Sequence, residues 1–102
     1  MSLFKRHKDK GLVAVDPDEG IVINFGFQRD MMLYEKQGRR FFIDKESGGG
    51  SELSFTIYIR TVRQEQLVGP TVDKVDEIFR KSIEADIRAA AETLQLRYEL
   101  VP

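Results

Sequence analysis

The sequence predicts a single α+β domain in which an antiparallel meander of about five strands is covered on one face by one long C-terminal helix. Two observations predict this fold class. Over residues 12–62, apolar and polar side chains alternate with a period of two, and turn residues interrupt the alternation. Over residues 71–96, apolar residues instead recur at spacings of three and four, as they do on one side of a helix. The chain of 102 residues is long enough for one hydrophobic core and too short for two.

Turn residues divide the predicted sheet into its strands. The turn over residues 16–20 contains a proline, which fixes φ, and ends on a glycine, which accepts a left-handed backbone. Gln37-Gly38 predicts a two-residue turn that places Tyr34 opposite Phe41. A further turn is expected over residues 28–30.

The glycine-rich residues 47–51 are either the loop of a hairpin or a flexible linker, natural or engineered. Two paired strands must turn their apolar side chains to the same face of the sheet, because a slip of one residue moves every side chain across. A register that meets this condition pairs three sets of residues: Phe41 with Ile57, Ile43 with Phe55, and Glu46 with Glu52. The hairpin is therefore the favoured interpretation, with 47–51 as its loop.

The helix expected over residues 71–96 has one apolar side. Thr71 is suited to cap its first turn, and Glu77–Lys81 and Glu84–Arg88 are supporting pairs at a spacing of four. The apolar positions of the helix are Val72, Val75, Phe79, Ile83, Ile87, Ala90 and Leu94. The sheet face that they are expected to cover consists of Met32, Tyr34, Phe41, Ile43, Phe55, Ile57 and Ile59. The last residues, 96–102, can return as an extended piece at the sheet edge.

Composition argues against several classes of function. The net charge of −1 lacks the basic excess of a nucleic-acid-binding domain, and the absence of cysteine removes disulfides and thiolate metal sites. No apolar run is long enough for a membrane span or for a signal peptide, so we expect a cytoplasmic protein. His7 lies in a basic segment, residues 1–11, that we expect to be mobile and unable to hold a catalytic base. We therefore expect no enzyme activity, catalytic residue, cofactor, metal, nucleic acid or membrane partner; an enzyme with a carboxylate site is an unsupported alternative.

The second face of the predicted sheet is more apolar than a face that is open to water normally is. It carries Met31, Leu33, Phe42 and Tyr58, interleaved with Glu35, Arg40, Asp44 and Arg60. Apolar anchors with a rim of mixed charge are typical of protein interfaces. The predicted protein-binding residues are Met31, Leu33, Arg40, Phe42, Tyr58 and Arg60. The alternative is that a terminal segment, "MSLFKRH" or "YELVP", folds back and covers this patch.

Two stretches, "LYEKQGRRFFIDKE" and "FTIYI", are followed by a helix, and together they resemble the small immunity proteins of bacterial polymorphic-toxin systems. The resemblance implies a non-enzymatic cytoplasmic protein that binds a cognate toxin and blocks it. Neutralisation would then occur by occlusion, with Arg40 and Arg60 pairing acidic groups of the partner. The runner-up interpretation is a structural domain that forms a homodimer through the same face.

Overall fold

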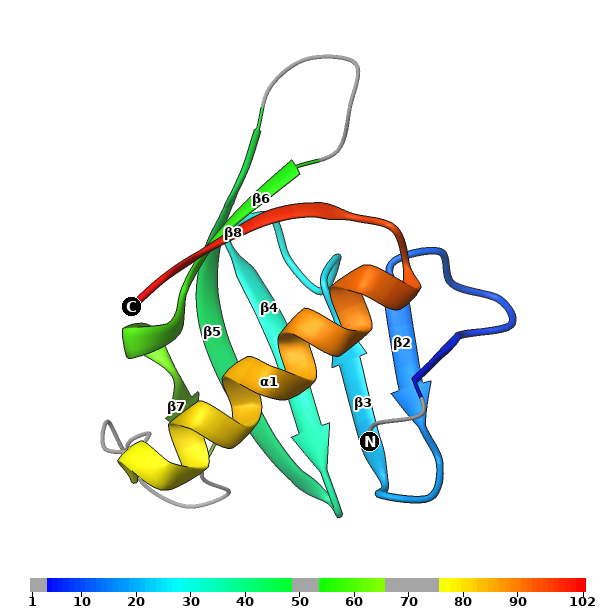
Figure 1. Cartoon of the computed structure of the whole chain (residues 1–102), viewed down its shortest axis with the longest axis horizontal. Helices are drawn as coiled ribbons and strands as arrows, with labels where there is room; N and C mark the ends of the chain where they lie inside the picture. The colour runs from blue at the N-terminus through cyan, green and yellow to red at the C-terminus, as the bar shows by residue number, and fades with distance from the viewer. Residues whose placement is uncertain (1–3, 49–53, 66–75) are drawn as a thin grey trace.

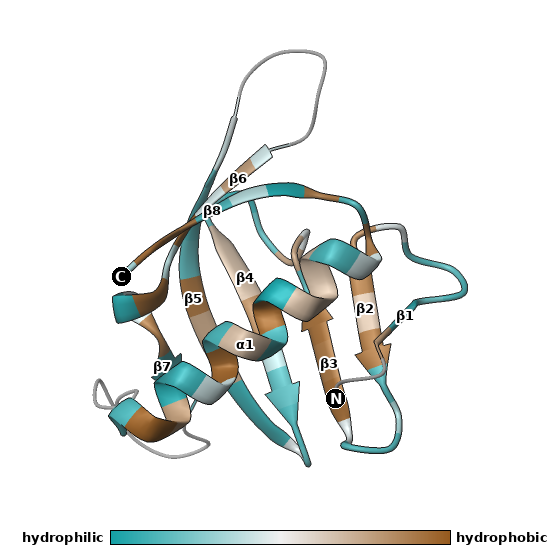
Figure 2. Cartoon of the chain, in the orientation of Figure 1, coloured by the Kyte–Doolittle hydropathy of each residue, from teal (hydrophilic) through white to brown (hydrophobic). Residues whose placement is uncertain are grey.

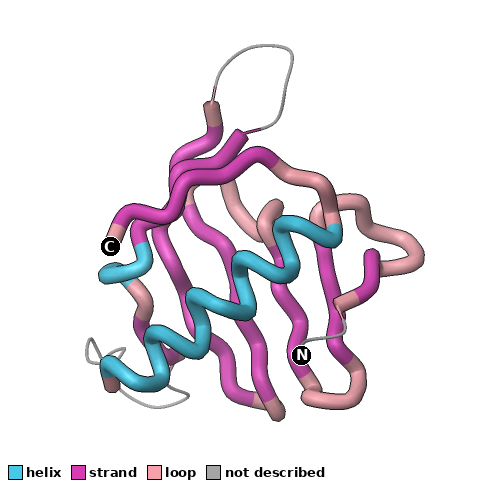
Figure 3. Tube along the Cα trace, viewed as in Figure 1, coloured by secondary structure: helices cyan, strands magenta, loops and turns pink. Residues whose placement is uncertain are grey.

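The computed structural model describes residues 4–48, 54–65 and 76–102, and it confirms the α+β class. One curled sheet, mostly antiparallel, carries a single described helix, α1, across one face (Figures 1 and 3). Along the sheet the strands follow the order β1-β2-β3-β4-β5-β6-β8, and β7 also pairs with β5. The elements are β1 (Lys5–Arg6), β2 (Val13–Asp16), β3 (Ile21–Asn24), β4 (Met31–Lys36), β5 (Arg39–Ser47), β6 (Ser54–Tyr58), the 3-10 turn η1 (Ile59–Thr61), β7 (Arg63–Gln64), α1 (Glu77–Thr93) and β8 (Arg97–Val101).

The predicted five-strand meander corresponds to β2–β6, and the strand count is higher because β1, β7 and β8 join the sheet. The two-residue turn has the predicted register, with Tyr34 opposite Phe41. Gln37 and Gly38 both have positive φ, 51° and 83°, which is the backbone of a type I′ hairpin turn. A hydrogen bond from the Gln28 N–H to the Met31 carbonyl closes the turn that was expected over residues 28–30.

The register predicted for β5 and β6 is wrong by four residues. Lys45, and not Phe41, lies opposite Ile57, and Glu46 lies opposite Thr56. The shift is even, so the predicted facing is preserved and Phe41 and Ile57 both point into the core. β5 and β6 are paired antiparallel strands, so they form a hairpin; residues 49–53 of its loop, and Glu52 with them, lie outside the described residues.

The reason for the shift is that two strands share one edge of β5. The nine residues of β5 pair with β7 through their first half, Phe41 with Gln64, and with β6 through their second half. Between β6 and β7 the chain makes the turn η1. The end of β6 is therefore not available to pair beside Phe41, and the hairpin closes further along β5.

α1 begins at Glu77, where the carboxylate of Asp76 accepts hydrogen bonds from the backbone N–H groups of Ile78 and Phe79. Asp76, and not Thr71, is therefore the N-cap of the described helix; Thr71, Val72 and Val75 lie outside the described residues. The predicted Glu84–Arg88 pair is present at 3.2 Å.

The helix ends at Thr93, before the predicted end at residue 96. Gln95 has a left-handed φ of 56°, and the Leu96 N–H donates to the Ala91 carbonyl, a C-terminal arrangement that redirects the chain. The chain then returns as β8, which pairs with β6 in parallel. The extended edge piece expected for the last residues is therefore confirmed.

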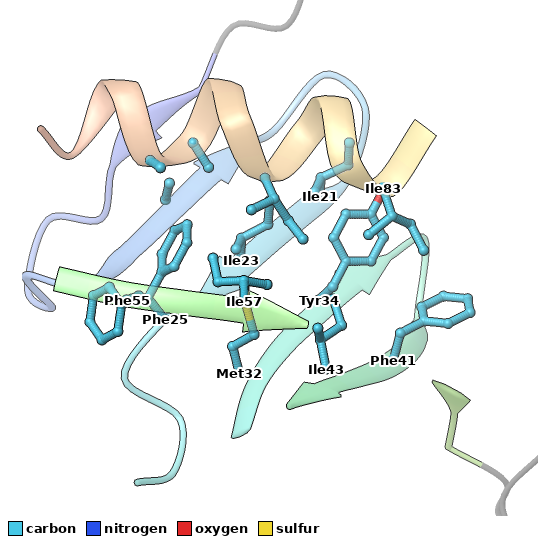
Figure 4. Close-up of a cluster of buried hydrophobic side chains, with 14 of the residues drawn as sticks. Ile21, Ile23, Phe25, Met32, Tyr34, Phe41, Ile43, Phe55, Ile57 and Ile83 are labelled. Atoms are coloured by element: carbon cyan, nitrogen blue, oxygen red, sulfur yellow. The ribbon is translucent and has the colours of Figure 1, made fainter. Parts of the chain in front are cut away.

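The core lies between α1 and the sheet face that the alternation predicted (Figures 2 and 4). Full burial of an isoleucine side chain contributes about 1.5–3 kcal/mol, so this layer is the main source of stability. The residues predicted for the sheet side are all buried: Met32, Tyr34, Phe41, Ile43, Phe55, Ile57 and Ile59. The helix contributes Ile83, Ile87, Ala90 and Ala91, and its C-cap residue Leu94 is also buried in this core.

The N-terminal segment was expected to be a mobile tail, and its described residues are instead part of the fold. Lys5–Arg6 pair with β2, and Phe4 is buried in the core cluster. The Arg6 guanidinium donates to the Leu94 carbonyl at the end of the helix. His7 is held by a backbone hydrogen bond to Val13. Among the described residues no helix is long and apolar enough to cross a membrane.

Candidate protein-binding face

The sheet surface opposite α1, called here the outer face, is built by the second set of alternating side chains. Leu33 lies opposite Phe42, Glu35 opposite Arg40, and Met31 opposite Asp44 on the paired strands β4 and β5. Four of the predicted residues, Met31, Leu33, Arg40 and Phe42, are therefore neighbours. Leu33 is buried, and Met31, Arg40 and Phe42 are half-buried.

An aromatic pair lies at the centre of the outer face. The rings of Phe27 and Phe42 stack with centroids 5.9 Å apart and planes 24° apart. The guanidinium of Arg40 lies over both rings, 5.8 Å from the Phe27 centroid and 5.7 Å from that of Phe42. Such cation–π contacts contribute about 0.5–1 kcal/mol each at exposed sites, so the three side chains hold one another in place.

Phe27 was missed by the sequence reasoning, because alternation applies only within a strand. In an extended strand Phe25 and Phe27 would share a face. Here they lie in the turn between β3 and β4, and the turn sends Phe25 into the core, where it stacks on Phe55, and Phe27 to the outer face. The described parts of the two terminal segments are strands of the sheet itself, Lys5–Arg6 as β1 beside β2 and Arg97–Val101 as β8 beside β6. These described residues therefore do not fold back over Phe42.

Ion pairs surround the aromatic pair. The Arg40 guanidinium lies 3.0 Å from Glu65, and its Nε lies 3.3 Å from Glu35 without hydrogen-bond geometry. Arg63, opposite Phe42 on β7, pairs with Asp44 at 3.1 Å. Arg63 and Glu65 were not predicted, because Arg63 lies in β7, whose two residues have too little alternation to be recognised, and Glu65 follows directly after that strand.

These contacts change the role expected for Arg40. Its charge is already balanced by two carboxylates of the same chain, and its guanidinium supports the aromatic pair. Arg40 therefore holds the two rings in place and is itself held by Glu65 of the same chain.

Tyr58 and Arg60 do not join this cluster. The shifted register places Tyr58 beside β8, opposite Val101, where its hydroxyl interacts with Glu46. Burial and then this hydrogen bond raise the pKa of Tyr58 above its ordinary value. Arg60 lies in η1, where the alternation ends, and it lines a depression of about 170 Å³ with α1 residues such as Arg80 and Lys81. Its predicted place on the outer face is wrong.

A buried polar pair joins α1 to the opposite side of the sheet. The hydroxyl of Tyr34, whose residue is fully buried, donates to the Asp86 carboxylate of α1 at 2.6 Å. Burial, and then the hydrogen bond to Asp86, raises the pKa of Tyr34 far above its ordinary value. Burial also raises the pKa of Asp86, and Tyr34 opposes that shift. The pair connects helix to sheet, and no group of three or more potential ligands for a metal ion exists among the residues described.

Comparisons of the chain with protein-family models, with curated proteins and with solved structures found no significant match.

Proposed function

We propose that this chain is a small, non-enzymatic protein-binding module and that it binds through the outer face. The observation that carries the proposal is the half-buried Phe27–Phe42 pair, with Met31 on the same surface and Arg40 over the rings. Aromatic residues, methionine and arginine are the residue types that protein interfaces favour, and such anchors supply most of the binding energy.

The proposed mechanism is occlusion. An apolar side chain of the partner packs on the two rings, and the surrounding ion pairs remain at the wet rim, where they set orientation more than affinity. Because Arg40 already holds the rings, the partner does not have to order them, and this preorganisation lowers the cost of binding. The resemblance to immunity proteins suggests a toxin as the partner, and a cytoplasmic, bacterial setting.

The test compares two apolar-to-acidic changes. Phe27→Asp places a charge in the aromatic pair, whereas the matched control Ile78→Asp changes a side chain that is 81% exposed on α1, away from the outer face. The products of the genes next to this one are tested as candidate toxins: each is co-expressed with the wild type and with both variants, and growth and co-purification are measured. We expect Phe27→Asp to lose protection and complex formation and Ile78→Asp to keep both. Equal protection by the two variants would contradict the proposal.

The second candidate is a homodimer through the same face. Sedimentation of the wild-type chain and the two variants tests self-association. If the chain forms this homodimer, we expect the wild type and Ile78→Asp to sediment as dimers and Phe27→Asp to sediment as a monomer. A wild-type monomer at all concentrations rejects the homodimer and leaves the foreign partner as the function tested by co-expression.

A further inference from the structure

A buried lysine lies at the end of β5, beside its pairing with β6. Lys45 is only 3% exposed, although lysine is almost never fully buried unless it is paired. Within the described residues its Nζ makes one hydrogen bond, to the backbone carbonyl of Arg29 at 3.2 Å, and lies 5.1 Å from the centroid of the Phe55 ring. Among the described residues, no carboxylate lies within ion-pair distance of the Lys45 Nζ.

This environment disfavours the charged form of the amine relative to a lysine in water. Burial lowers the pKa of Lys45 because it removes water from the ammonium group, and the nearby charge of Asp30 opposes the shift only in part. A lysine amine attacks carbonyl groups in its neutral form, and desolvation, by lowering the pKa, makes that form more accessible.

Lys45 also lines an open depression of about 390 Å³, which is within the range of small-molecule sites. Its other lining residues are Arg29, Asp30, Glu46 and Ser47. The exposed Arg29 carries a guanidinium that can form a bidentate pair with a carboxylate or a phosphate. Asp30 offers a carboxylate and Ser47 a hydroxyl, both of which can form hydrogen bonds to a bound ligand. An amine, an anion-binding cation and hydrogen-bonding groups thus line one space.

We propose that this depression is a covalent binding site for a small aldehyde or 2-keto acid that carries an anionic group. The neutral Nζ of Lys45 attacks the carbonyl carbon and forms a carbinolamine. The nitrogen then loses its proton, the hydroxyl leaves as water, and a C=N bond joins the ligand to Lys45, so one water is released for each imine formed. Arg29 holds the anionic end. The site lies at the β5–β6 end of the sheet and is independent of the proposed role of the outer face.

The experiment uses glyoxylate as the anionic aldehyde and propanal as a neutral one, each trapped by cyanoborohydride at neutral pH. Peptide mass spectrometry then gives the rate of labelling at each lysine. We expect Lys45 to react with glyoxylate faster than the exposed Lys81, because a lowered pKa leaves a larger fraction of the amine neutral at a given pH. Unfolding in urea should remove the difference.

Two variants make the result specific. Arg29→Met should abolish the preference of Lys45 for glyoxylate over propanal and leave its reaction with propanal unchanged. Lys45→Met removes the amine but keeps the unbranched apolar stem, so the variant should fold and lose the fast site, whereas Lys81→Met should keep it. Labelling of Lys45 in the folded wild type that is no faster than that of Lys81, or a preference for glyoxylate that survives Arg29→Met, would overturn the proposal.

Discussion

At the scale of single residues, the direction in which a strand side chain points could be predicted, and its partners across layers could not. Alternation assigned Tyr34 to the core side, and it is buried there. Its hydrogen bond to Asp86 depends on how α1 lies across the sheet, and no local pattern carries that information. Lys45 is a second example. Its position in the alternation of β5 places its side chain on the core side, and it is buried there, although a charged residue is expected at the surface.

Asp86 makes stability depend on pH in a direction opposite to that of most acidic groups. Its pKa is raised in the folded protein, chiefly by burial and by the charges of Asp16 and Glu19, while Tyr34 and Lys36 oppose the shift. The folded state therefore binds this proton more tightly than the unfolded chain, in which an aspartate has a pKa of about 3.9. The contribution of Asp86 to stability is full below that pH and is lost as the pH rises through the folded pKa.

Asp86→Asn should remove this dependence. We expect the free energy of unfolding of the wild type, minus that of the variant, to fall as the pH rises from about 3 to 7, as measured by urea unfolding. The variant amide still accepts a hydrogen bond from Tyr34, so both proteins should fold. A difference that grows with pH would show that the ionised carboxylate is the stabilising form and would contradict this reading of the Tyr34–Asp86 pair.

At the scale of elements, type and facing were predictable, whereas boundaries and register were not. The spacing of apolar residues identified α1, but Thr71 and Asp76 are both acceptable caps and the pattern does not choose between them. Parity fixed which face β5 and β6 share, and an even shift of four residues leaves parity unchanged. β7 has two residues, too few for a period, although it decides where β6 can pair.

The helix cap gives a prediction at this scale. Asp76→Ala removes the acceptor for the N–H groups of Ile78 and Phe79 and should lower the free energy of unfolding by about 0.5–2 kcal/mol. Asp76→Asn is the matched control, because asparagine caps about as well as aspartate, and it should cost little. Chemical denaturation measures both. An equal loss in the two variants would mean that the charge, and not the cap, matters.

At the scale of the whole molecule, the sequence was sufficient for the α+β class and for the two layers of the core. It brought four of the six predicted outer-face residues together, Met31, Leu33, Arg40 and Phe42. Tyr58 and Arg60 were displaced by the register shift and by η1. Phe42 instead has Phe27 and Arg63 as neighbours: the turn between β3 and β4 brings Phe27 to it, and the short strand β7 places Arg63 opposite it.

The composition of the outer face thus depends on the sharing of β5 between β6 and β7. If β6 alone ran along β5 in the register predicted from parity, Phe42 would lie opposite Thr56, and the Arg63–Asp44 pair would not form. In the structure Glu46 lies opposite Thr56 and Phe42 lies opposite Arg63. The binding proposal rests on the second arrangement.

Paired cysteines measure this directly, because the chain has no cysteine of its own. Opposite residues of an antiparallel pair have Cα atoms about 4.5–5.5 Å apart, within the range that a disulfide spans. Under mild oxidation we predict that Glu46→Cys with Thr56→Cys forms an intramolecular disulfide in the folded protein and that Phe42→Cys with Thr56→Cys does not. Efficient bridging of the Phe42/Thr56 pair, with none at Glu46/Thr56, would contradict the account.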